Sequence, residues 1–176
     1  APLGKSTRFM TPPTRGFRLL RDAVLSLSLT QPFVGPLYHW RTSRPHEYTR
    51  SLLNAVSDDN ATFEGGPGHG APPRNIRLDN DRFLLDHLDH RFTLLWATDN
   101  GSSLPDDVRA LVDEARAQGL PLQVIAVGAR QPVAGADRTL PDADGHLRRR
   151  HGLSSGGAYL LRPDQHVCAR WAALDA

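Results

Sequence analysis

Hydrophobic residues in the second half of the chain fall into short runs separated by one helical stripe. Residues 92–97 and 122–127 are almost wholly apolar, as is typical of parallel strands that are covered on both faces. Between them, apolar residues recur at helical spacing over about 105–119, with a proline in the first turn and a glycine at the end. The order strand, helix, strand predicts a parallel βαβ unit.

A second pair of apolar runs follows near the end of the chain. Residues 156–161 and 167–171 flank the turn sequence Arg162-Pro163-Asp164-Gln165. Because proline presets φ and aspartate bonds its own backbone, we expect a hairpin here that closes the sheet. The smaller expected elements are a short strand at 75–78, short helices at 82–88 and 142–150, and a loop at 128–141.

The first sixty residues differ in character. Apolar residues at three- and four-residue spacing predict a helix over about 14–29. Its inward stripe consists of Phe17, Leu20, Val24 and Leu27. Residues 31–50 are irregular and rich in rings, and the Gly/Pro-rich residues 65–73 are either a linker or a long wrapping loop.

These patterns predict an α/β protein with a thioredoxin-like fold, a mixed sheet with flanking helices, preceded by a helical arm. We divide the chain into an arm at 1–57, a linker at 58–74 and a thioredoxin-like domain at 75–176. In that fold the reactive thiol sits where the first strand of the βαβ unit meets its helix. Here this junction, residues 98–103, holds no cysteine, and no proline stands just before the hairpin. We therefore expect no thiol–disulfide chemistry.

The one cysteine, Cys168, lies in the last predicted strand. Strict alternation would put it on one face with His166 and Arg170, and would put Val167, Ala169 and Trp171 on the other. Neighbours two apart on a strand are too distant for a good hydrogen bond, so His166 is a poor base for this thiol. We interpret Cys168 as a small residue packed on the sheet.

Other polar clusters are also weak candidates for chemistry. Two ligands from residues 86–90 have the spacing of a helical metal site, but no third ligand is evident. The carboxylate pairs at 58–59, 106–107 and at 142 with 144 are explained by turns and by the helix dipole. No Gly-rich phosphate loop is present. We therefore expect no catalytic, cofactor-binding or metal-binding residues in this chain. The residues of the possible metal site are Asp86, His87, Asp89 and His90.

Composition and net charge limit the classes of partner and the location that we expect for the chain. The 176 residues carry a formal charge of only +2, so nucleic acid is not an expected partner. The basic run at 148–151 is interpreted as a solvated helix end, with a phosphate contact as the alternative. No apolar run approaches the ~18 residues of a membrane span, and a single cysteine fits a reducing, cytoplasmic location.

Several segments, taken in order, resemble one family. The chain resembles the C-terminal part of class A FAD-dependent aromatic-ring hydroxylases of the 3-(3-hydroxyphenyl)propionate hydroxylase-like and phenol hydroxylase-like groups. The resemblance is carried by the order and spacing of these segments and covers most of the chain. They are residues 7–12 leading into 17–23, Tyr48 with 51–53, residues 68–72, residues 92–95, and residues 161–167 with Arg170.

The resemblance implies a thioredoxin-like domain that lacks the cysteine pair and is associated with subunit contacts and stability. FAD and NAD(P)H are implied for the parent enzyme, whose flavin-binding motifs do not occur here. The leading hypothesis is a non-catalytic accessory domain whose arm, residues 1–57, lies on the parent flavin domain or on a second copy, giving a homodimer. One alternative is a stand-alone module that binds an aromatic small molecule or hydrophobic peptide through residues 33–48. The other is an independent peroxidase or reductase.

Overall fold

The computed structural model describes residues 7–34, 45–78, 82–99 and 102–174. The chain forms two compact units, Ala1–Pro45 and His46–Ala176, which are described separately below. No helix in the described ranges is long and apolar enough to cross a bilayer.

The first unit is built around helix α2, Arg15–Ser28, which matches the expected helix to within about a residue at each end. The Thr14 hydroxyl accepts a hydrogen bond from the Phe17 N–H at 3.3 Å and caps the helix. The short 3-10 helix η1, Pro32–Val34, follows. Val24 is the one buried residue of α2, and the rest of its expected inward stripe is exposed.

The second unit contains a five-stranded mixed sheet of order β3-β2-β1-β4-β5. β1 runs parallel to β2, which runs parallel to β3, and β4 pairs antiparallel with both β1 and β5. Central β1 therefore joins the parallel half to the antiparallel hairpin. The strands are β1 Phe92–Ala97, β2 Leu122–Val127, β3 Arg138–Leu140, β4 Ala158–Leu161 and β5 Val167–Trp171.

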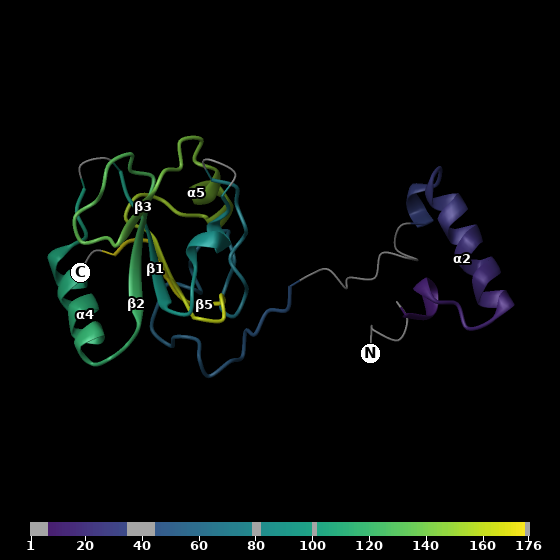
Figure 1. Cartoon of the computed structure of the whole chain (residues 1–176), viewed down its shortest axis with the longest axis horizontal. Coiled ribbons are helices and arrows are strands. Elements are labelled where there is room, and N and C mark those ends of the chain that lie inside the picture. The colour runs from purple at the N-terminus through teal and green to yellow at the C-terminus, as the bar shows by residue number, and fades with distance from the viewer. Residues whose placement is uncertain (1–6, 35–44, 79–81, 100–101, 175–176) are drawn as a thin grey trace. The chain divides into compact units, whose positions relative to one another are not determined.

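Helices cover both faces of this sheet (Figure 1). Helix α4, Asp106–Ala117, packs Val112 into a cluster on one face. Helix α5, His146–His151, and the 3-10 helix η3, Leu84–His87, pack on the other. The expected βαβ unit and the closing hairpin are thus confirmed, and the fold is α/β.

Three smaller expectations need correction. The expected loop at 128–141 contains β3, whose three residues are too few and too exposed to give an alternating pattern. The expected strand at 75–78 makes only an isolated bridge between Arg77 and Phe83. The expected helix at 82–88 is the shorter η3, and the one at 142–150 is α5, which starts later.

A bulge in the hairpin also overturns the expected alternation in β5. Leu160 pairs with Ala169 while Leu161 pairs with Val167, so Cys168 is an extra residue without a partner across the strand. Consequently Val167 packs into the α5-side cluster, whereas Trp171 packs into the α4-side cluster. Strict alternation had placed Val167 and Trp171 on the same face.

Residues 46–74, here called the wrapping segment, run along the outer edge of β5. The Ala55 N–H donates to the Cys168 carbonyl at 2.9 Å, and the Asp59 N–H donates to the Arg170 carbonyl at 3.0 Å. Val167 accepts from the Gly70 N–H at 2.9 Å. An uncovered sheet edge is a site for unwanted pairing, and this segment covers it. These contacts agree with the interpretation of the Gly/Pro-rich residues 65–73 as a wrapping loop rather than as a linker.

Two glycines let the wrapping segment approach so closely. Gly70 has φ +69°, and a side chain there would collide with the Tyr48 backbone, whose N–H donates to the Gly70 carbonyl at 2.9 Å. Gly66 has φ +64°, and a side chain there would collide with the His151 carbonyl and the Tyr159 hydroxyl. Both positions therefore need glycine for conformation and for space.

The hairpin turn yields a stability prediction. Gln165 has φ +60°, the one non-glycine residue with positive φ among those described, and a side chain there is strained. We expect Gln165→Gly to raise the unfolding free energy by about 0.5–1 kcal/mol, measured by chemical denaturation. Gln131→Gly, in an exposed loop without positive φ, is the control and should stabilise nothing. Equal effects of the two changes would contradict this account.

Candidate functional site

The most elaborate polar site in the described residues surrounds Arg170 on β5, whose side chain is 7% exposed. Its Nε donates to Asn60 Oδ1 at 2.8 Å, and its Nη2 donates to the Asn60 carbonyl at 3.0 Å. Its Nη1 donates to the Gly65 carbonyl at 2.9 Å and to the Pro67 carbonyl at 3.3 Å. The guanidinium also lies 4.7 Å from the centre of the Phe63 ring. Arg170 therefore holds the wrapping segment by its backbone carbonyls.

Asp58 and His69 extend this site. His69 Nε2 lies 2.7 Å from Asp58 Oδ2, which also accepts the Arg170 N–H at 2.9 Å. Burial favours a higher pKa for Asp58, but the hydrogen bonds from His69 and from the Arg170 and Asn60 N–H groups outweigh it and lower the pKa. The carboxylate is thus held ionised between the wrapping segment and β5.

A second buried network joins α5 to the sheet through His151, which is fully buried. Its Nδ1 lies 2.9 Å from the Leu147 carbonyl, and its Nε2 accepts the Arg74 N–H at 3.2 Å. This pair of bonds fixes the neutral tautomer, with the proton on Nδ1. Tyr159 donates its hydroxyl hydrogen to the His151 carbonyl at 2.6 Å. Burial lowers the pKa of His151 and raises that of Tyr159.

Cys168 has a structural environment. Its Sγ lies 3.1 Å from the Leu53 carbonyl, and burial raises the pKa of its thiol, which disfavours the reactive thiolate. His166 instead contacts the Asp164 carbonyl through Nδ1 at 2.7 Å and stacks edge-on against the Tyr48 ring. The structure therefore gives the thiol no base among these neighbours.

Arg162 donates to Asp164 through Nε at 3.0 Å and through Nη2 at 2.8 Å. The hydrogen bonds from Arg162 lower the pKa of Asp164. Arg162 also reaches the wrapping segment, with Nη1 3.4 Å from Asn54 Oδ1. Arg162 and Arg170 thus bind the same segment from the two ends of β5.

The junction where a thioredoxin would carry its thiol is occupied by ion pairs. Asp99 follows β1 and accepts from Arg148 Nη1 at 3.1 Å. Hydrogen bonds from Ser155 and from Arg148 lower the pKa of Asp99. Asp142 accepts the N–H groups of Leu147 and Arg148, each at 3.0 Å, and so caps α5. The charged groups near this junction therefore fasten α5 to the sheet.

The residues of the possible metal site are dispersed. Asp86 accepts the Phe83 N–H at 2.8 Å, and hydrogen bonds from Arg91 lower the pKa of Asp89 to about 2. His87 is buried, and its Nδ1 has no partner among the described residues. Within those residues no group of three His, Cys, Asp or Glu side chains is placed to hold a metal ion.

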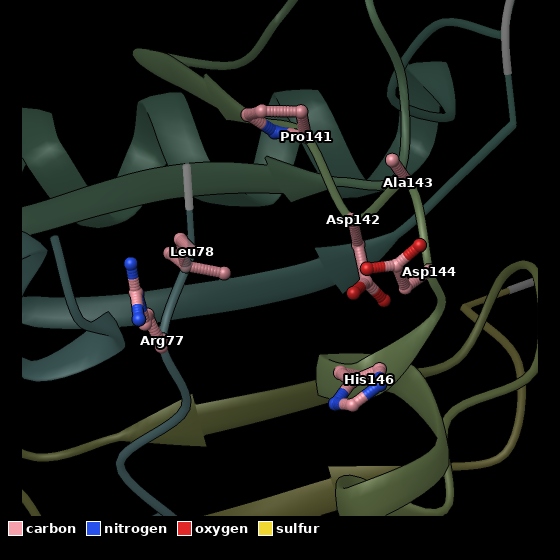
Figure 2. A pocket seen from close by; sticks show the side chains of 7 residues that line it. All are labelled: Arg77, Leu78, Pro141, Asp142, Ala143, Asp144 and His146. Atoms are coloured by element: carbon pink, nitrogen blue, oxygen red, sulfur yellow. The ribbon is translucent and has the colours of Figure 1, made fainter. Parts of the chain in front are cut away.

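The hollow in Figure 2 lies between α5 and the segment after the wrapping segment, with a volume of about 300 Å³. Arg77 and Leu78 stand on one side, and Asp142, Asp144 and His146 on the other. Asp142 is bonded to the α5 backbone, Leu78 and Pro141 are half-buried, and the other lining residues are exposed. Most of the ring-rich segment, residues 35–44, lies outside the described residues.

Sequence inspection missed the roles of Asp58, Asn60 and His69. The expected turn at Asp58 and Asp59 is present, since the Asp59 carbonyl accepts the Thr62 N–H at 3.0 Å. However, Asp59 Oδ2 also accepts the Ala172 N–H at 2.8 Å, more than a hundred residues along the chain. No short-range signal could have revealed this pairing, because its partners are backbone groups of a distant strand.

Comparison with known proteins follows this geometry. No known protein-family model matches the chain. It is 34% identical over 138 residues to 4-methyl-5-nitrocatechol 5-monooxygenase of Burkholderia sp., an alignment that covers 78% of this chain and 23% of the relative.

Three solved structures have similar folds. The flavin-dependent monooxygenase PieE, in complex with FAD and substrate, matches 94% of this chain with 28% of its own, at TM-score 0.54 and 22% identity. Aklavinone-11 hydroxylase with FAD and aklavinone matches 88% with 29% of its own, at TM-score 0.54 and 20% identity. The rebeccamycin biosynthetic enzyme RebC with reduced flavin matches 96% with 27% of its own, at TM-score 0.55 and 18% identity.

By their names, two of these proteins are monooxygenases and one is a hydroxylase, and the three solved structures contain a flavin. The chain is similar to one part of each. It spans about a quarter of the length of each of these relatives. The similarity thus concerns a domain-sized portion of such enzymes rather than the whole.

The Arg170 site predicts a specific loss of stability. Arg170→Met keeps the aliphatic stem beside Phe63 but leaves the carbonyls of Asn60, Gly65 and Pro67 without their donor. We expect the unfolding free energy to fall by roughly 2–4 kcal/mol. Hydrogen exchange should show faster exchange of the Asp59 amide. The control Arg149→Met, at an exposed α5 position, should change neither; similar losses in both variants would contradict the assignment.

The His151 network predicts how stability depends on pH. Because the folded-state pKa of His151 is lowered, its contribution is complete above the unfolded pKa of about 6.5 and is lost as the pH falls below that value. The unfolding free energy should therefore decrease between about pH 7 and pH 5. His151→Gln should flatten this slope, and His90→Gln, at an exposed position, should not. Parallel slopes in all three proteins would refute the prediction.

Proposed function

We propose that this chain is a non-catalytic C-terminal accessory domain of an FAD-dependent aromatic-ring monooxygenase. It serves the assembly and stability of the parent, in the cytoplasm and as part of a homodimer. Its fold is the thioredoxin-like one without the cysteine pair. The βαβ unit followed by an antiparallel hairpin, with β1 between β2 and β4, supports that assignment.

The observation that supports the proposal is that the buried polar groups are bonded to other parts of the same chain. Arg170, Asp58 and His151 all bind the protein itself and fix one segment to another. A catalytic residue must instead present a polar group to a substrate. Of the sequence candidates, Asp86 accepts the Phe83 N–H, Asp89 is bonded to Arg91, and the Cys168 thiol lies against the Leu53 carbonyl.

The described residues do not fit FAD. The hollows in this part of the chain are shallow and lined largely by exposed side chains, whereas cofactor sites bury most of the ligand. Asp99, which lies in the polar loop after β1, presents a carboxylate that is bonded to Arg148. FAD and NAD(P)H therefore belong to the remainder of the parent, and no chemical step is assigned to this chain.

Exposed apolar side chains supply a surface for the parent. In the wrapping segment, Leu52 and Val56 are fully exposed although their backbone is anchored to β5 through Ala55. Phe17, Leu20 and Leu27 of α2 are also exposed. Burying each such side chain is worth about 1.5–3 kcal/mol, which favours a partner that covers them.

Two measurements test this function. The purified 176-residue chain should show no flavin absorbance and no NAD(P)H oxidation with phenolic substrates. When co-expressed with the flavin-containing remainder of its parent, it should co-elute with that protein and raise its melting temperature. Stoichiometric flavin binding or turnover by the chain alone would overturn the proposal.

A surface variant sharpens the test. Leu52→Ser combined with Val56→Ser removes two fully exposed side chains and should weaken co-elution while leaving the melting temperature of the chain itself unchanged. The matched control is Leu111→Ser with Leu120→Ser, exposed residues on and after α4. Equal weakening by both pairs would argue against a docking role for the wrapping segment.

A further inference from the structure

A second hollow, next to the one in Figure 2, is lined mainly by basic side chains. It lies between α5 and the extended residues 74–77 and has a volume of about 340 Å³. It shares Arg77 and His146 with the hollow in Figure 2, so the two adjoin. Among the described residues, no carboxylate lines it. Its lining consists of Arg74, Asn75, Ile76, Arg77, His146 and Arg150.

The backbone beneath these side chains is fixed from both sides. The Arg74 N–H is bonded to the buried His151 ring at 3.2 Å. The Ile76 carbonyl accepts the Leu84 N–H at 2.9 Å, which ties the same segment to η3. On α5, His146 and Arg150 are four residues apart and share one face. The hollow therefore has a preorganised base from which flexible cationic side chains extend.

Two of the arginines that line this hollow have no ionic partner among the described residues. The side chains of Arg74 and Arg150 make no ion pair with them, whereas Arg148 on the same helix pairs with Asp99 and lies 3.7 Å from Asp142. Burial has the largest effect on the pKa of His151 and lowers it, and the Leu147 hydrogen bond comes next and raises it. The charge of Arg74 has a smaller effect, which also lowers this pKa. The Asp142 carboxylate acts on the same ring in the opposite direction, and it is itself bonded to the Leu147 and Arg148 N–H groups. Arg74 and Arg150 are therefore the lining cations left for an anion.

We propose that this hollow binds the phosphate groups of a compact anion such as a pyrophosphate. Guanidinium groups bind phosphate oxygens with paired hydrogen bonds, and several arginines around one hollow favour a ligand with more than one negative charge. A long polyanion fits less well, because the whole chain has a formal charge of only +2. The pyrophosphate is either a free ion or part of a nucleotide.

This site does not depend on the proposed accessory function. It requires only the chain in isolation and a phosphate-bearing ligand. A failure to bind phosphate would leave the accessory role untouched, and a failure of that role would leave the hollow intact.

The experiment measures thermal shift and calorimetric binding with inorganic phosphate, pyrophosphate, NADH and NADPH, each against sodium chloride of matched ionic strength. We expect saturable stabilisation by pyrophosphate that sodium chloride does not reproduce. Arg74→Gln with Arg150→Gln should weaken pyrophosphate binding at least about tenfold. Because both residues are exposed, circular dichroism should show an unchanged fold.

The control removes the same charge elsewhere. Arg50→Gln with Arg149→Gln changes two exposed arginines outside the lining and should keep wild-type affinity. Binding of the nucleotides as tight as that of pyrophosphate supports a nucleotide source, and binding of pyrophosphate alone supports the free ion. No shift beyond sodium chloride, or equal loss in both double variants, would overturn the proposal.

Discussion

The second unit depends on one buried cation. Arg170 stands on β5, next to the hairpin bulge, and its guanidinium reaches backbone carbonyls of residues more than a hundred positions earlier. A buried arginine is tolerable only when its donors are satisfied, and here the carbonyls of an irregular segment supply the partners. In return, that segment gains the hydrogen bonds that a loop without regular structure otherwise lacks. These bonds keep the wrapping segment on the outer edge of β5, which it covers.

The remaining polar groups follow the same logic. Asp58 joins the wrapping segment to the backbone of β5, His151 joins α5 to residue 74, and Asp142 caps α5. Each of these groups is bonded to the protein itself and fixes one segment to another. Arg74 and Arg150, which line the hollow beside α5 and make no ion pair with the described residues, are therefore a distinct feature of the surface.

A second feature of the surface is a set of large apolar side chains that are exposed to solvent. The described part of α2 buries Val24 and leaves most of its apolar residues in water, and the wrapping segment presents Leu52 and Val56 on an anchored backbone. Soluble proteins seldom expose clustered apolar side chains without a partner. The chain also matches only about a quarter of its relatives' length. Both facts favour a domain that works as part of a larger protein.

The sequence by itself determined the elements whose signal is local. Apolar runs gave β1 and β2, helical spacing gave α2 and α4, and the Arg-Pro-Asp-Gln turn gave the hairpin, because each depends on neighbours within a few residues. Only the tertiary structure decided the bulge at Cys168, the short strand β3 and the attachment of the wrapping segment. These depend on hydrogen bonds between groups far apart in the chain. Residue spacing carries no record of such bonds, since a backbone carbonyl looks the same at every position.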